Sequence, residues 1–158
     1  MTDTTTTPGG GTADGNAGGL PEHLRSRHVR VGELPWQPAD FPGVEYKTLL
    51  IDKEQGLLTV LLKMAPGAVL PDHEHVRIEQ TYMLEGRLVD KGGAEVGLEV
   101  GPGEFVWRPA GSRHSAWTPD GALMIAMFLV PNRFFDQDGR EVDMLGDDWE
   151  AKWRAALG

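Results

Sequence analysis

The sequence contains no cysteine. That absence excludes disulfide bonds, thiolate metal ligands, zinc ribbons and a cysteine nucleophile together. Long hydrophobic runs are also missing, because the longest, residues 122–130, has nine residues against the roughly 20 that a membrane helix needs. Basic residues are scarce: 15 Lys and Arg against 24 Asp and Glu give a net charge of −9. This balance argues against nucleic acid or an anionic membrane as a partner.

The first 20 residues have almost nothing to bury. They are mostly Thr, Gly, Ala, Asp and Asn, so we expect residues 1–20 to be a flexible leader. The start has neither the basic nor the apolar segment of a secretory signal, and the cytoplasm is the expected location. Residues 21–158 are then expected to form a single domain, long enough to bury a hydrophobic core.

Residues 28–130 read as a series of short strands. Segments such as 44–51 and 57–65 are rich in aliphatic, β-branched and aromatic residues, and Pro-Gly or Gly-containing turns such as Pro66-Gly67 separate them. Strands of four to nine residues with turn signals every 8–12 residues indicate an all-β sandwich or barrel.

The C-terminal residues 131–158 are expected to form a hairpin and a short helix. Residues 136–139 give a turn signal between strand-like neighbours. Residues 147–157 begin with a capping box and place Trp149 and Trp153 on one helical face. That stripe is expected to pack on the barrel or on a neighbouring subunit.

Three of the five histidines and one glutamate lie within a segment of 48 residues that ends at His114. His73 and His75 are two residues apart, so on a strand both imidazoles face the same side. Glu79 can join them only if the chain bends, because a straight strand would place it roughly 13 Å beyond His75. His114 must come from a distant strand. We interpret these four residues as a metal site, in which Glu79 is either a ligand or a base beside the ion.

The same residues match the two motifs of the cupin superfamily. The motifs are Gly67-x5-His73-x-His75-x3-Glu79-x6-Gly86 and Gly103-x5-Pro109-x-Gly111-x2-His114. The chain therefore resembles a cupin, which implies a double-stranded β-helix (jelly-roll) barrel, with its core at about residues 44–130 and one metal ion in its mouth. The departure from the motifs is Thr118, where the second one usually ends in asparagine.

Two groups of cupins are similar to this chain. Residues 71–128 resemble the cupin domain of ChrR-type anti-sigma factors, which carry a helical zinc-binding domain before the cupin; the leader found here instead disfavours an anti-sigma role. Residues 131–139 resemble stand-alone cupin dioxygenases that cleave acetylacetone or dihydroxyacetophenone. The acetylacetone enzymes use three histidines and lack the motif glutamate, whereas this chain has Glu79.

The second resemblance implies a dioxygenase that uses Fe(II) and O₂ to cleave a C–C bond of a small enolisable diketone or hydroxyaryl ketone. Zn, Mn, Ni and Cu are alternatives, because imidazole and carboxylate ligands also suit them. Two other classes stay open: a non-redox Zn or Mn isomerase or lyase with Glu79 as its base, and a metal-dependent small-molecule sensor. Resemblance to other cupins also implies a homodimer. Candidate residues of the substrate pocket are Arg77, Tyr82, Trp107, Met124 and Phe128.

Overall fold

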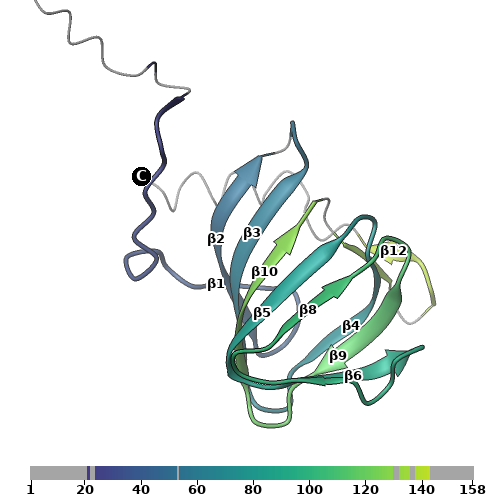
Figure 1. Ribbon diagram of the computed structural model, residues 1–158. Coiled ribbons are helices and arrows are strands. Elements are labelled where there is room, and N and C mark those ends of the chain that lie inside the picture. Colours follow the sequence, from purple (N-terminus) through teal and green to yellow (C-terminus); the bar gives the residue numbers. More distant parts are fainter. Residues whose placement is uncertain (1–20, 22–23, 53, 130–131, 136–137, 143–158) are drawn as a thin grey trace, which may run out of the picture.

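The computed structural model describes residues 21, 24–52, 54–129, 132–135 and 138–142. This part of the chain contains no α-helix, and its strands form two antiparallel sheets that face each other (Figure 1). The all-β prediction is thus confirmed. Among these residues no helix has the length and apolar character needed to cross a membrane. The expected leader and C-terminal helix lie outside the described residues.

The described residues contain twelve strands. They are β1 (Gln37–Pro38), β2 (Val44–Asp52), β3 (Leu57–Met64), β4 (Val69–Glu74), β5 (Glu79–Gly86), β6 (Leu88–Gly93), β7 (Glu99–Val100), β8 (Phe105–Arg108), β9 (Arg113–Trp117), β10 (Ala122–Phe128), β11 (Arg133–Phe135) and β12 (Glu141–Val142).

The order of the strands in the sheets brings the two motifs together. One sheet runs β1-β2-β3-β10-β5-β8 and the other runs β12-β11-β4-β9-β6-β7. The late strands β9 and β10 are therefore inserted between early strands, β9 between β4 and β6, and β10 between β3 and β5. As a result β4, which carries His73 and ends just before His75, pairs with β9, which carries the histidine of the second motif.

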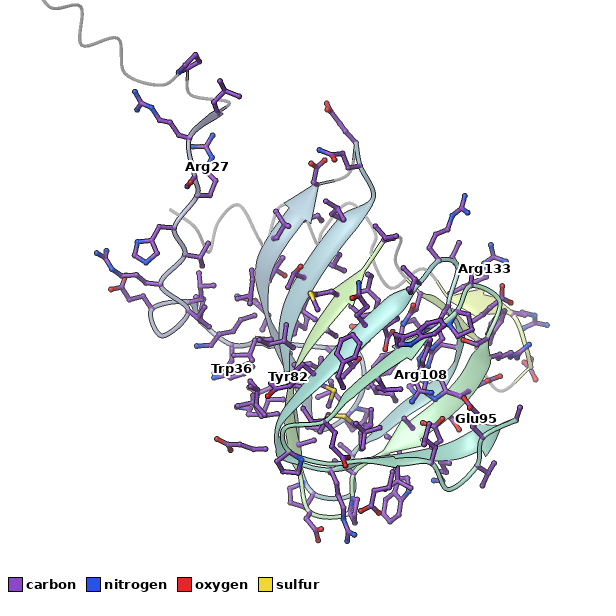
Figure 2. The ribbon with its side chains drawn as sticks, viewed as in Figure 1. Arg27, Trp36, Tyr82, Glu95, Arg108 and Arg133 are labelled. Carbon is purple, nitrogen blue, oxygen red and sulfur yellow. The ribbon has the colours of Figure 1, made fainter. Side chains whose placement is uncertain are left out.

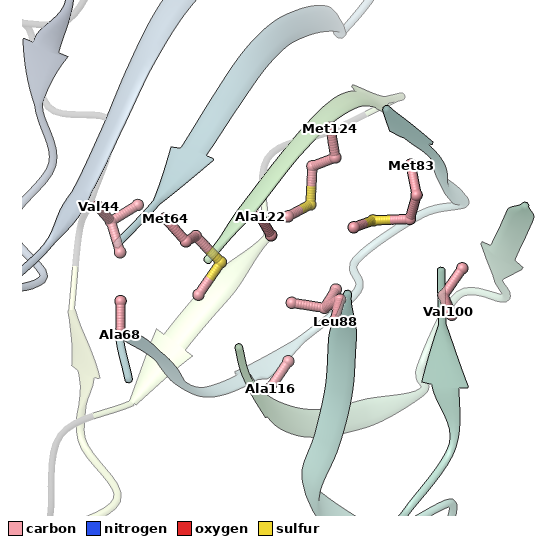
Figure 3. Packing of buried hydrophobic residues seen from close by; sticks show 9 residues of the cluster. All are labelled: Val44, Met64, Ala68, Met83, Leu88, Val100, Ala116, Ala122 and Met124. Atoms are coloured by element: carbon pink, nitrogen blue, oxygen red, sulfur yellow. The ribbon is translucent and has the colours of Figure 1, made fainter. Parts of the chain in front are cut away.

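The hydrophobic core lies between the two sheets (Figure 3). On β10, buried Ala122, Met124 and Ala126 alternate with positions that are partly exposed, because successive side chains of a strand point to opposite faces. Three methionines, whose flexible side chains fill irregular spaces, belong to this core. Its buried members are Val44, Met64, Ala68, Met83, Leu88, Val100, Ala116, Ala122 and Met124.

Gly86, at the end of β5, allows a close approach of two chain segments. Its φ is +66°, and a Cβ at this position would collide with the carbonyl oxygen of Gly121. We expect Gly86→Ala to lower the free energy of unfolding by at least about 2 kcal/mol, because a strained φ and a backbone collision must both be relieved. Chemical denaturation measures this loss.

The matched control for this substitution is Gly67→Ala. Gly67 also has a positive φ, +80°, but an added Cβ there would meet nothing within 4 Å. Gly67→Ala should therefore lower the free energy of unfolding by less, about 1 kcal/mol. Equal losses in the two variants would show that the approach of Gly121 does not matter.

Candidate metal centre

Strands β4 and β9 bring the histidines of both motifs face to face. His73 lies directly opposite His114 in the antiparallel register. His75 follows the end of β4, but its backbone goes on pairing: its amide donates to the Ser112 carbonyl at 2.9 Å, and its carbonyl accepts from the Gly111 amide at 2.7 Å. This pairing keeps the backbone extended, and the three histidine side chains are buried together.

The three imidazoles form a compact group. Their ring centroids are 4.5 to 5.1 Å apart, and one nitrogen from each ring lies within 4.8 Å of the others. That spacing is close to the roughly 4 Å that can separate two ligands about 2 Å from a shared ion. The Nε2 atoms of His75 and His114 are buried without a hydrogen-bond partner. Because buried polar atoms nearly always have one, this group fits a site for a divalent metal ion.

Two of the rings have clear partners at Nδ1. His73 Nδ1 lies 2.8 Å from the Pro71 carbonyl oxygen. His75 Nδ1 lies 3.1 Å from Asn132 Oδ1 and 3.1 Å from Glu79 Oε2. Such partners fix the orientation and tautomer of a histidine that binds metal through its other nitrogen. Nε2 is thereby left as the ligand atom.

The third ring, His114, lies against a buried ion pair that joins the two sheets. Asp90 on β6 places Oδ1 3.0 Å from His114 Nδ1, at an angle that makes no hydrogen bond. Arg108 lies on β8 (Figure 2). It donates two hydrogen bonds to this carboxylate, at 2.8 and 3.0 Å. Asp90 is 2% exposed and Arg108 4%. No motif in the sequence marks this pair. The available signal is that Asp90 lies two positions after the apolar Leu88, so that on a strand both side chains face the same side.

Glu79 is held by hydrogen bonds on both carboxylate oxygens. Asn132 Nδ2 donates to Oε2 at 2.6 Å, and Thr81 Oγ1 donates to Oε1 at 3.2 Å. Burial raises the pKa of Glu79, but the hydrogen bond and charge of His75, together with His73 and Asn132, lower it to about 2. The carboxylate is therefore ionised at neutral pH.

The bend that the spacing of His75 and Glu79 requires is present, because β4 ends at Glu74 and β5 begins at Glu79. This bend brings Glu79 beside His75. Within the described residues, however, the converging group of ligand atoms consists of His73, His75 and His114, without the glutamate.

Acid should destabilise the metal-free protein. Burial lowers the pKa of His73 from 6.5 to about 4, against the opposing effect of Glu79. Between these pH values the unfolded chain binds a proton that the folded chain does not, so stability falls as the pH falls from 6.5 to 4. The expected loss is on the order of 3 kcal/mol. Glu79 adds a loss of the same sign between about pH 4.5 and 2.

Urea unfolding of chelator-treated protein at several pH values measures this loss. His73→Gln should flatten the change between pH 6.5 and 4. His28→Gln replaces an exposed histidine and should keep the wild-type profile. A His73→Gln profile identical to that of the wild type would contradict the assignment.

A cavity of about 110 Å³ adjoins the histidines between the two sheets. This is smaller than a 150 Å³ engineered cavity that holds benzene, so the cavity suits a compact ligand. Among the described residues, no lysine or arginine lines it. Its walls are apolar except for Tyr46, His73, Glu79, Thr81, His114 and Asn132.

Two of the five candidate pocket residues line this cavity, Met124 and Phe128. Tyr82 and Trp107 do not, because they occupy outward positions of β5 and β8 and are 41% and 57% exposed. Arg77 does not either, because it lies in the bend between β4 and β5 and is exposed. Strand alternation decides these placements, since neighbouring positions face opposite sides of a sheet.

A sequence model of a family described as the ChrR cupin-like domain matches residues 25–133. No curated protein matches the sequence.

Solved structures with a similar fold include two that are described as acetylacetone dioxygenases. A candidate acetylacetone dioxygenase from Methylibium petroleiphilum PM1 has a TM-score of 0.73 and 23% identity, over 85% of this chain and 98% of that one. An acetylacetone dioxygenase from Acinetobacter johnsonii has a TM-score of 0.72 and 20% identity, over 86% and 96%. The Rhodobacter sphaeroides complex of SigE with the anti-sigma ChrR gives a TM-score of 0.52 and 21% identity, over 63% and 50%. At such identities these likenesses concern the fold alone.

Proposed function

The chain belongs to the ChrR cupin-like domain family, which confirms the predicted cupin barrel, and from this premise we propose that it is a metal-dependent dioxygenase. In this proposal His73, His75 and His114 bind one divalent ion, Fe(II), and the substrate is a small enolisable diketone or hydroxyaryl ketone. The ion supplies Lewis acidity toward the substrate oxygens and, as Fe(II), reactivity with O₂. For a β-diketone, one C–C bond breaks and both atoms of O₂ enter the products, a carboxylic acid and a dicarbonyl compound.

The observation that carries this proposal is the apolar cavity beside the three histidines. A phosphorylated or polyhydroxylated substrate would find few polar partners there, and burying unpaired polar groups is costly. A small diketone has only two oxygens to satisfy, and the polar lining of the cavity includes His73, His114 and Asn132. The cavity therefore favours an enolisable ketone over the sugar substrate of an isomerase.

The size of the cavity favours the smaller of the two substrate types. At about 110 Å³ it suits an aliphatic diketone better than a hydroxyaryl ketone, which contains a complete benzene ring. The fold relatives described as acetylacetone dioxygenases support the same choice. The apolar walls, Met124 and Phe128 among them, also keep bulk water from the reacting atoms.

Glu79 supplies no strong base in this arrangement. Hydrogen bonds from Thr81 and Asn132 to its two oxygens stabilise the ionised carboxylate, so it has little tendency to take a proton at neutral pH. The enol proton of the diketone therefore goes to solvent, before or during entry into the cavity.

Oxygen uptake tests the proposal directly. Protein loaded with Fe(II) and given acetylacetone should consume one O₂ per substrate, at a rate far above that of metal-free protein. Elemental analysis of protein purified without added metal should find iron. Retained zinc with anaerobic turnover of a carbonyl or sugar substrate would instead identify an isomerase or lyase. Retained zinc with ligand binding but no turnover would identify a sensor.

We also propose that the protein is a homodimer that associates through the outer face of β5 and β8. Tyr82 and Leu84 on β5 and Phe105 and Trp107 on β8 are 37% to 57% exposed. Tyr82 lies opposite Phe105 in register, so this outer aromatic patch is continuous. Contiguous exposed apolar patches on soluble proteins mark interaction surfaces, and aromatic residues are enriched in interfaces.

Sedimentation measures the association. The double substitution Phe105→Glu and Trp107→Glu should give monomers. Val96→Glu, at a position that is 65% exposed and outside the patch, should leave the dimer intact. A wild-type protein that sediments as a monomer at micromolar concentrations would rule out the dimer.

A further inference from the structure

One side of the barrel is closed by side chains and not by strand pairing. In the described part of the chain, no pairing joins the β1-β2 edge of one sheet to the β12-β11 edge of the other. Phe41, in the turn between β1 and β2, contacts Phe134 on β11, with ring centroids 5.0 Å apart. Both side chains line the cavity beside the histidines. The two phenylalanines therefore bridge the gap between the sheets at the edge of the cavity.

An open groove adjoins this aromatic contact. It has a volume of about 690 Å³ and is lined by residues 38–45 and 63–66. Three of these residues, Ala39, Phe41 and Val44, also line the inner cavity. They form the wall that separates the groove from the cavity.

Phe41 is the residue of this wall whose side chain can open it. Ala39 has a short side chain, and its amide donates to the Val44 carbonyl at 2.9 Å. Val44 is 3% exposed and belongs to the core. Phe41 is only partly buried, and its ring moves by several ångströms when its side chain changes rotamer. We propose that small molecules enter the cavity from the groove, and that the Phe41 side chain is the gate between the two.

The backbone of the turn that carries Phe41 is held in place. The Phe41 carbonyl accepts from the Val44 amide at 3.1 Å, and the Gly43 carbonyl accepts from the Ala65 amide at 2.8 Å. Pro42 followed by Gly43, whose φ is +76°, is typical of a type II turn. The gate therefore opens by rotation of a side chain and not by movement of a loop. Such rotations are fast for side chains that reach the surface.

Phe134 is the fixed partner of the gate. It lies opposite His73 in the register of β11 and β4, and its ring centroid is 4.9 Å from that of His73. Phe41, Phe134 and His73 thus form a stack that leads from the groove to the histidines. One aromatic contact contributes little energy, so Phe41 can leave Phe134 without disturbing His73. An opened gate would admit a molecule directly beside the candidate metal centre.

The charges at the groove favour molecules without a negative charge. The one lysine among its lining residues, Lys63, is paired with Glu45 at 2.6 Å. Asp40 adds a further carboxylate. Its charge reaches the cavity wall, because burial raises the pKa of Tyr46 and Asp40 raises it further. For the diketone of the proposed function, this places the loss of the enol proton during entry and not before it.

Exchange NMR with xenon tests the gate on the metal-free protein. Xenon is a small uncharged atom that binds in apolar cavities, and the experiment measures the rate constant of its entry. Phe41→Leu removes the aromatic contact with Phe134 and should speed entry about 2- to 10-fold, the factor that the loss of such a contact implies. Phe41→Trp places a larger ring at the gate and should slow entry. Entry at the wild-type rate in both variants would overturn the inference.

Phe128→Leu is the matched control. Phe128 lines the inner cavity but not the groove, so the same substitution enlarges the cavity without touching the gate. It can change the affinity for xenon, but the rate constant of entry should stay that of the wild type. Equal acceleration by Phe41→Leu and Phe128→Leu would show that the cavity volume sets the rate, and would contradict a gate at Phe41.

A thiol introduced at the gate allows it to be closed again. The chain has no cysteine, so Phe41→Cys can be alkylated at one position. N-ethylmaleimide should react there, and the adduct should slow xenon entry relative to the unmodified variant. Val96→Cys, at a position that is 65% exposed and lines neither space, should react without any effect on entry. A thiol at position 41 that does not react, or whose adduct leaves entry unchanged, would contradict the inference. Thermal unfolding of each variant verifies that it is folded.

The outcomes for this inference and for the proposed function can be told apart, because xenon exchange uses neither metal nor substrate. A protein that consumes no O₂, but in which Phe41 controls the entry of xenon, would refute the dioxygenase and leave the gate standing. Oxygen uptake by a protein whose Phe41 variants all admit xenon at the wild-type rate would do the reverse.

Discussion

His114→Ala is expected to weaken binding of the divalent ion by more than about 100-fold. Loss of a group that only orients a ligand costs about 10- to 100-fold, and loss of one of three ligands should cost more. The substitution keeps the backbone pairing of β4 with β9, where His73 lies opposite residue 114, so the effect on ion binding comes from the lost imidazole. Dioxygenase activity should fall to the level of metal-free protein.

Competition with a chelator and elemental analysis measure this effect. His28→Ala, which replaces an exposed histidine, should bind as the wild type does. The strongest challenge to the site is the variant in which His73, His75 and His114 are all alanine. If that variant still takes up one ion per chain, the ion binds elsewhere.

Arg108→Met is expected to lower the free energy of unfolding by about 3–5 kcal/mol. The substitution removes both hydrogen bonds to Asp90 and leaves that carboxylate, 2% exposed, as a buried charge without its partner. Breaking a buried ion pair from one side typically has this cost. Urea unfolding of the metal-free protein measures it, and zinc affinity should fall as well, because Asp90 lies against His114.

Two further variants make this prediction specific. Arg87→Met removes an arginine whose side chain is 42% exposed and which pairs with Asp120 and Glu99, so its loss should stay below about 1 kcal/mol. The double substitution Arg108→Met and Asp90→Leu removes both buried charges and should recover much of the loss. Similar small losses for Arg108→Met and Arg87→Met would mean that the buried pair contributes little.

The sequence by itself determined the fold class and the three histidines. Short apolar segments between Gly and Pro turns can bury one face only as paired strands, so the all-β architecture follows from local pattern. Two histidines two residues apart must share a strand face. The separation of His75 from Glu79 required a bend, and the chain bends between β4 and β5. Except for His114, which the second motif identifies, these are short-range properties fixed by backbone geometry.

Only the tertiary structure decided what surrounds the histidines. Asp90, Arg108 and Asn132 come from β6, β8 and the segment after β10, and no spacing in the sequence connects them to His75 or His114. The partners of the Glu79 carboxylate depend on the same long-range packing.

The tertiary structure also decided which face of each strand looks inward. A period of two separates the two faces of a strand but does not say which one is buried, because a shift of one residue exchanges them. The sequence pattern therefore allowed Tyr82 and Trp107 to be predicted as walls of the pocket. In the structure, β5 and β8 are paired and both side chains lie on their outer face. Strand pairing across the barrel supplies the information that local pattern lacks.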